Sequence, residues 1–126
     1  MITSEKPNAL IVEDNEINLE IIERYITDIC AVDSINNGTD AIGMASKKKY
    51  DIVLMDINLG NDIDGITTTK EIKKMAEYSD VPFVALTGYA MSGDKEKLLN
   101  LGLTHYLSKP FEKEELSSLI KKILSL

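Results

Sequence analysis

Four short apolar runs, each followed by a polar residue, constrain the fold of this chain more than any other feature. The runs occupy residues 9–12, 52–55, 83–86 and 106–107. Continuous apolar runs are typical of strands whose two faces are both covered, as in a parallel sheet between layers of helices. Ligands of such sheets bind beyond the carboxyl ends of the strands, so the polar residues after the runs form a candidate site.

Helical patterns alternate with these runs. The apolar positions of the first pattern recur every three or four residues on one wide face: Leu19, Ile22, Ile26 and Ile29, with Ile21 and Tyr25 beside them. Further helices are predicted over 39–48, 64–78 and 90–101 and from residue 112. A weaker strand with alternating polarity, 31–35, reads as an edge strand. Five strand–helix alternations predict an α/β fold with a parallel sheet and right-handed crossovers.

Length and composition limit the classes of function. A chain of 126 residues is one domain, so we expect residues 1–126 to form a single unit, with a core of about 8–125 and no effector domain. The net charge of −7 argues against direct nucleic-acid binding. Cys30 is the only cysteine, and no apolar stretch reaches the roughly 20 residues of a membrane span. We therefore expect a cytoplasmic domain without membrane contact, tethered only if it belongs to a membrane-bound protein.

The polar residues after the runs suit phosphoryl chemistry. Asp56 follows the most apolar run, and a carboxylate there is a competent nucleophile toward an activated phosphorus. The adjacent pair Glu13-Asp14 offers hard oxygen ligands for a divalent cation, for which Mg²⁺ is the expected ion. Thr87 and Lys109 supply a hydroxyl and an ammonium for phosphoryl oxygens.

Each of these residues also has an ordinary structural interpretation. Taken alone, Asp56 is a loop or cap residue, Glu13-Asp14 marks a helix N-terminus, Thr87 is a turn residue and Lys109 is a surface lysine. The functional interpretation rests on their coincidence, because every one of them falls at the same end of a different strand.

These residues carry a resemblance to a known family. In order and in spacing the chain resembles the receiver domain of two-component response regulators, the CheY-like family, at Glu13-Asp14, Asp56, Thr87-Gly88 and Lys109-Pro110. The resemblance extends over nearly the whole chain. It implies a (βα)5 flavodoxin-like three-layer sandwich with a five-stranded parallel sheet in the order 2-1-3-4-5. The segment 12–15 together with Asn18 is similar to receivers attached to hybrid histidine kinases.

The resemblance also implies a function. Asp56 would accept a phosphoryl group from the phosphohistidine of a sensor histidine kinase or a histidine phosphotransfer protein. Asp14, Asp56 and the backbone carbonyl of Asn58 would hold Mg²⁺, with Glu13 contributing through water. Thr87 and Lys109 would bind the phosphoryl oxygens. Such a chain is a signalling module in a phosphorelay, limited to its own phosphorylation and dephosphorylation, and not an enzyme acting on other substrates.

A conformational switch is implied as well. Tyr106 matches the family's switch aromatic, which turns inward when Thr87 moves toward the phosphate, and the Lys109–Pro110 bond would be cis. The switched face, formed by the expected helix 90–101, the strand 104–107 and the last helix, would bind a downstream protein partner. The chain would be a monomer or a phosphorylation-dependent dimer.

One loop departs from the family pattern. Gly60 stands where the family usually has proline, and Asp64-Gly65 arrives one residue later than usual. We therefore expect the segment 58–63 to be more flexible than in most receivers.

Three other functions were weighed. A haloacid-dehalogenase-type phosphatase needs a second aspartate two residues after the nucleophile, and this chain has Asn58 there. A nucleotide-binding flavodoxin-like protein is disfavoured, because neither a G-x-x-x-x-G-K-[ST] loop nor a G-x-G-x-x-G turn is present. The remaining alternative is a degenerate, phosphorylation-independent binding module on the same fold.

Overall fold

A five-stranded parallel sheet organises the molecule. The computed structural model describes residues 6–57, 59, 63–88 and 102–126. The strands are β1 (Asn8–Val12), β2 (Ala31–Ile35), β3 (Ile52–Asp56), β4 (Phe83–Thr87) and β5 (His105–Ser108). Their order is β2-β1-β3-β4-β5, so the predicted 2-1-3-4-5 order is confirmed and the weak strand is at an edge.

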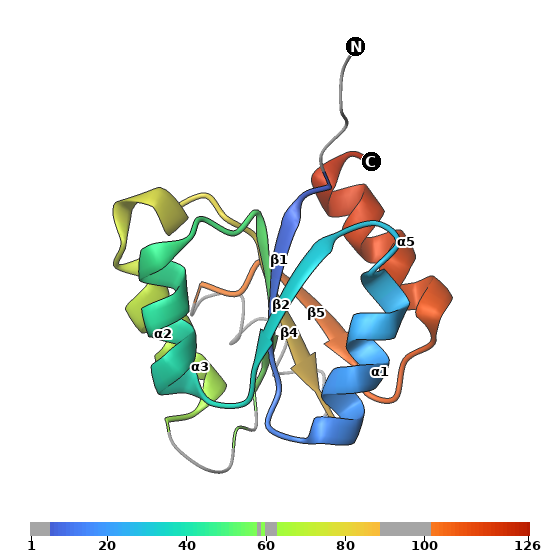
Figure 1. Ribbon diagram of the computed structural model, residues 1–126, viewed down its shortest axis with the longest axis horizontal. Coiled ribbons are helices and arrows are strands. Elements are labelled where there is room, and N and C mark those ends of the chain that lie inside the picture. Colours follow the sequence, from blue (N-terminus) through green and yellow to red (C-terminus); the bar gives the residue numbers. More distant parts are fainter. Residues whose placement is uncertain (1–5, 58, 60–62, 89–101) are drawn as a thin grey trace.

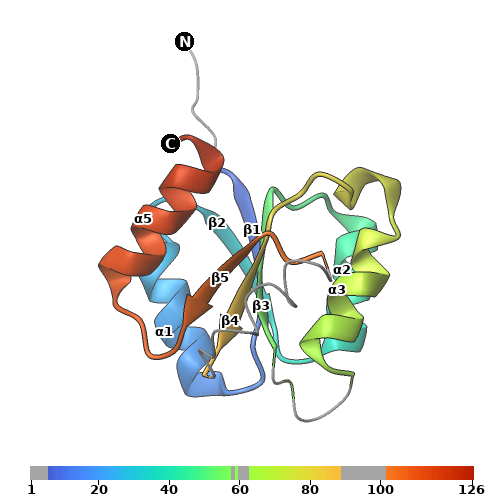
Figure 2. The same ribbon diagram turned by 180° about the vertical axis from the view of Figure 1, so that it is seen from behind.

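Helices cover both faces of this sheet. On one face lie α1 (Glu16–Ile26) and α5 (Lys113–Leu124), and on the other lie α2 (Gly38–Lys47) and α3 (Gly65–Lys73) (Figures 1 and 2). This three-layer arrangement is the predicted flavodoxin-like sandwich. The helix expected over 90–101 falls outside the described residues, as does most of the loop 58–63.

Alternate residues of the central strands belong to two separate core clusters, one on each face of the sheet. Leu10, Val53 and Phe83 face the α2–α3 side, whereas Ile11 and Leu54 face the α1–α5 side. Every residue of β3 and β4 is buried. Because both faces are covered, an apolar residue is favoured at every position, and this is why the strands appear in the sequence as continuous runs.

Local hydrogen bonds define where most helices begin. The side chains of Asn15, Asn37 and Asp64 each accept a hydrogen bond from the backbone N–H three residues later. Glu112 and Glu115 form a capping box at the start of α5. Such caps satisfy N–H groups that have no partner within the helix. The caps predicted at Asn15 and Asp64 are thereby confirmed.

The prediction of one helix over 64–78 is wrong at its C-terminal end. Helix α3 ends at Lys73, Met75 adopts an extended conformation, and a short 3-10 turn, η1 (Ala76–Tyr78), follows. The cause is tertiary, since the buried Tyr78 hydroxyl donates to the carbonyls of Ala45 and Lys48 and accepts from a backbone N–H. A continuous helix would not keep Tyr78 in this position.

The apolar face predicted for the first helix is also narrower than expected. Ile22 and Ile26 are buried, but Ile21 is 41% exposed. Helix α1 ends at Ile26, so Ile29 lies beyond it in the connection to β2. Ile21 is thus available to line a surface feature described below. None of the helices in the described part of the chain has the length and apolar character needed to cross a membrane.

Candidate functional site

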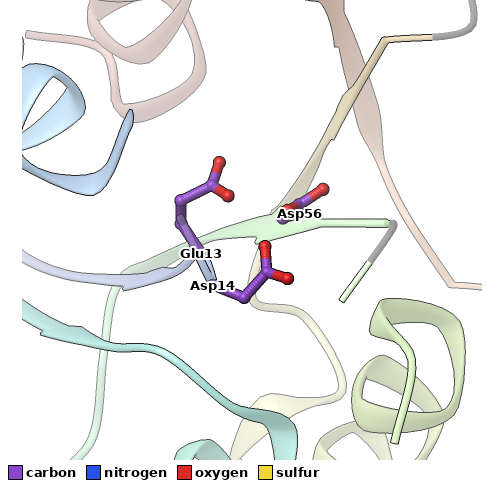
Figure 3. A group of neighbouring side chains, drawn as sticks. All are labelled: Glu13, Asp14 and Asp56. Carbon is purple, nitrogen blue, oxygen red and sulfur yellow. The ribbon is translucent and has the colours of Figure 1, made fainter. Parts of the chain in front are cut away.

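Three carboxylates meet at the carboxyl edge of the sheet. Glu13 and Asp14 follow β1 directly, and Asp56 is the last residue of β3 (Figure 3). One oxygen of each side chain lies within 4.8 Å of the others. Glu13 is 1% exposed and Asp56 is 3% exposed, so two of the three acids are held in a nearly dry environment. Concentrated, buried carboxylates of this kind require a compensating cation.

Part of that compensation comes from Lys109, which follows β5. Its ammonium donates a hydrogen bond to Oε1 of Glu13 at 2.7 Å and lies 3.4 Å from Oδ1 of Asp56. The Lys109–Pro110 peptide bond is cis, as expected from the family resemblance. The sequence predicts all four residues at one edge of the sheet, and the structure brings Lys109 into contact with Glu13 and Asp56 and places Asp14 close to both acids.

The surroundings of Glu13 raise the pKa of its carboxyl group strongly. Burial, together with the adjoining Asp56 carboxylate, raises the pKa of Glu13 from 4.5 to about 7, although the Lys109 ammonium acts in the opposite direction. The remaining oxygen of Glu13 accepts from the backbone N–H of Asn15 at 3.3 Å. Glu13 is therefore held in place by two donors from different parts of the chain.

Thr87 ends β4 on the same edge. It is 4% exposed, and its backbone carbonyl accepts from the N–H of Lys109 at 2.7 Å. This bond ties the start of the Lys109–Pro110 turn to the end of β4, so the hydroxyl and the ammonium predicted to act together come from adjacent strands. The Asn58 carbonyl, proposed from sequence as a metal ligand, lies outside the described residues.

Gly65 was noticed in the sequence only as part of an Asp-Gly pair, but the structure gives it a specific role. A Cβ atom at this position would lie 2.1 Å from the backbone carbonyl oxygen of Asp56. The first turn of α3 therefore approaches the backbone of the candidate phosphoacceptor more closely than any side chain allows. No periodicity in the sequence signals this contact.

An apolar pocket of about 390 Å³ adjoins the acidic cluster formed by Glu13, Asp14 and Asp56. The sequence does not predict it, because Ile21 and Tyr25 lie beside the apolar face of the first helix and periodicity gives no sign of a pocket there. The rings of Tyr25 and Phe111 meet edge to face with centroids 6.4 Å apart. Lys109 lines the pocket and also contacts two of the clustered acids, Glu13 and Asp56. The lining residues are Asn18, Ile21, Ile22, Tyr25, Lys109, Pro110 and Phe111.

Comparison with known proteins identifies the family. Residues 9–121 match the model of the response regulator receiver domain. The chain therefore belongs to the receiver-domain family of two-component signalling systems, a family of signalling modules and not of typical enzymes. The fold class and the family predicted from the sequence are both confirmed.

The relatives include both long and short proteins. The chain is 37% identical over 113 residues to the signal transduction histidine-protein kinase BarA of Escherichia coli, which covers 89% of this chain but 12% of BarA. It is 34% identical over 119 residues to the polar-differentiation response regulator DivK of Brucella anthropi, covering 93% of this chain and 95% of DivK. Similar domains thus occur both within long kinases and as short regulators.

One solved structure is informative about the site. The receiver domain of the sensor histidine kinase PA1611 from Pseudomonas aeruginosa superposes with a TM-score of 0.86 at 34% identity, covering 96% of this chain and 99% of that one. That structure holds a magnesium ion coordinated in its active-site cleft.

Proposed function

We propose that this domain is a phosphorylation-operated switch in which Asp56 accepts a phosphoryl group from a phosphohistidine of a sensor kinase or a phosphotransfer protein. The observation that carries the proposal is the position of Asp56. It is a nearly buried carboxylate at the end of the central strand β3, grouped with Glu13 and Asp14 and 3.4 Å from the Lys109 ammonium. In this proposal Asp56 is the nucleophile, the neighbouring acids are metal ligands and Lys109 is the cation that binds the phosphoryl group.

The transfer itself needs no further protein group. A carboxylate oxygen of Asp56 forms a bond to phosphorus as the phosphorus–nitrogen bond of the phosphohistidine breaks, and the electron pair of that bond returns to the imidazole. The incoming phosphoryl oxygens carry negative charge. The ammonium of Lys109 and the hydroxyl of Thr87 are the donors that bind them in this proposal.

The donor set fits a divalent cation. Three carboxylates have oxygens within 4.8 Å of one another, and two of them as direct ligands would meet the preference of Mg²⁺ for one or two protein carboxylates plus water. Asp14 and Asp56 would bind the ion directly, together with the Asn58 carbonyl, and Glu13 would act through water. The bound ion would neutralise charge between the carboxylates and the phosphoryl group. The magnesium site of the related PA1611 receiver supports this assignment.

The phosphodonor must present its histidine at Asp56, so it must contact the rim of the site. The apolar pocket between α1 and the turn after β5 shares Lys109 with the acidic cluster. Ile17 is 70% exposed and Ile21 is 41% exposed on α1 beside this region. We assign this surface to the phosphodonor protein, because a partner docked there lies within reach of the phosphoacceptor.

Output would pass through a different surface of the domain. Thr87 would move toward the phosphoryl group, Tyr106 would turn inward, and the face that includes β5 and α5 would change its affinity for a downstream protein. The domain would act as one unit over residues 1–126, as a monomer or as a phosphorylation-dependent dimer.

Intact-mass spectrometry tests the proposal. The protein is incubated with acetyl phosphate and Mg²⁺, with and without a chelator, beside Asp56→Asn. The expected result is one added phosphoryl group in the parent protein, absent in the variant and after chelation. If no adduct forms although Mg²⁺ binding is detected separately, the domain is either a receiver that needs its partner kinase as phosphodonor or the alternative, a phosphorylation-independent binding module.

A further inference from the structure

A hydrogen bond within β5 is not used by the function proposed above. The hydroxyl of Ser108 donates to the phenolic oxygen of Tyr106 at 3.2 Å. Residues two apart on a strand point to the same face, so the serine and the tyrosine ring lie on one side of the sheet. The ring packs against the core cluster on the α2–α3 side.

Strand pairing puts this hydroxyl next to Thr87. Thr87 pairs with Ser108, and Ala85 pairs with Tyr106, in the parallel ladder between β4 and β5. Paired residues on neighbouring strands lie roughly 5 Å apart with their side chains on the same face. Ala85 belongs to the core cluster against which Tyr106 packs, so Thr87, two residues later, faces the same side. Ser108 therefore stands between the two proposed switch residues.

We propose that Ser108 is a positioning residue for the switch: its hydroxyl orients the Tyr106 ring along the sheet, toward the Thr87 end of β5, before any phosphoryl group is bound. A partly buried tyrosine hydroxyl needs a hydrogen-bond partner, and Ser108 supplies one from the same strand. The orientation of the ring then depends on β5 itself as well as on movement of Thr87. This inference rests on the proposed function, since Tyr106 must be the switch aromatic for its orientation to control output.

A matched pair of variants separates the hydroxyl from the shape of the side chain. Ser108→Thr keeps a hydroxyl and Ser108→Val replaces it with a methyl group, and both are β-branched residues suited to a strand. The readout is the fluorine NMR signal of Tyr106 in unphosphorylated protein labelled with 3-fluorotyrosine. The chain has five tyrosines, and the Tyr106 signal is identified as the one that is missing from the spectrum of Tyr106→Phe.

We expect Ser108→Thr to keep the parent signal and Ser108→Val to move it toward a more solvent-exposed position. Loss of one neutral hydrogen bond predicts a change of roughly fivefold in the ratio of the two ring orientations. Identical Tyr106 signals in the Thr and Val variants would overturn the proposal.

A second measurement tests whether the effect comes from this hydrogen bond or from a general change in the structure. The stability difference between Ser108→Thr and Ser108→Val, measured by urea unfolding, should shrink when Tyr106 is replaced by phenylalanine, because the phenolic oxygen is then gone. An undiminished difference would contradict the role of this hydrogen bond. Neither measurement requires phosphorylation, so failure of the acetyl phosphate experiment and failure of this inference are distinguishable.

Discussion

The carboxylate of Glu13 accepts a hydrogen bond from the ammonium of Lys109 at 2.7 Å, although the two residues are 96 positions apart in the chain. Asp56, the proposed phosphoacceptor, lies farther from the same ammonium, at 3.4 Å. Lys109 therefore compensates two buried acids at once, and its removal affects both. This shared cation connects the stability of the fold to the charge state of the site.

Replacement of Lys109 by methionine should destabilise the domain in metal-free buffer. Glu13 is 1% exposed and would lose its closest cationic partner, and its pKa is already about 7, so the carboxyl must then either remain a buried charge or take up a proton. At a pH above that pKa we expect a loss of about 2 kcal/mol. Urea unfolding with chelator measures it. Added Mg²⁺ should recover part of the loss, and the double variant with Glu13→Gln should lose less than the sum of the single variants. Strict additivity would mean that the two residues do not interact.

Replacement of Ile21 by glutamate should slow phosphorylation by a protein donor without changing phosphorylation by acetyl phosphate. Ile21 lines the apolar pocket and is 41% exposed, so the fold should be retained. We expect transfer from a phosphorylated histidine phosphotransfer domain to fall about tenfold, the effect of losing one well-packed interface residue. Phosphorylation by acetyl phosphate should not change, because that small donor needs no docking surface.

Ala76→Glu adds the same charge at an exposed position of η1, away from the pocket, and serves as the control. Equal slowing of transfer by both variants would indicate a general charge effect and would remove the pocket from the docking surface.

Replacement of Gly65 by alanine should damage both stability and the site. The new Cβ would lie 2.1 Å from the Asp56 carbonyl oxygen, and backbone on both sides must shift, at a cost of about 1–3 kcal/mol. We expect slower phosphorylation by acetyl phosphate as well, measured by intact mass. Gly43→Ala in α2 is a matched control, because apart from its chain neighbours and its own helix backbone no atom lies within 4 Å of its Cβ, and it should stabilise the helix by about 0.5–1 kcal/mol.

Acid stability should depend on Asp33. This β2 carboxylate accepts from the Tyr50 hydroxyl at 2.7 Å and from the Lys48 ammonium at 3.0 Å, and these donors, the tyrosine first, lower its pKa. Because the folded-state pKa lies below the unfolded one, the ionised carboxylate stabilises the fold above about pH 4, and this stabilisation is lost as the pH falls through the folded-state pKa.

The comparison of the parent protein with Asp33→Asn tests this dependence. Urea unfolding should find the parent more stable at pH 7, by less than about 1 kcal/mol because the side chain of Asp33 is 39% exposed, and the difference should shrink toward pH 3. A difference that stays constant with pH would mean that the charge of Asp33 contributes nothing.

Local patterns in the sequence predicted most of the fold correctly. The strands ended close to where the apolar runs end, and the caps at Asn15 and Asp64 formed as expected. The helix over 64–78 was wrong because hydrogen bonds of the Tyr78 hydroxyl to residues about thirty positions away outweigh helical periodicity. The wide apolar face predicted for the first helix includes Ile21, which is 41% exposed, because periodicity marks an apolar face without saying how much of it a neighbouring element covers.

The sequence by itself determined most of the strand and helix pattern and the family, and it predicted which residues take part in the chemistry. These features depend on residue order, on hydrogen bonds three or four residues apart and on the rule that parallel strands end at one edge. Only the tertiary structure decided that Lys109 contacts Glu13 more closely than Asp56, that Gly65 touches the Asp56 carbonyl and that Ser108 bonds Tyr106. Distances of this kind follow from how strands, turns and helices pack together, so they cannot be predicted from the spacing of residues along the chain.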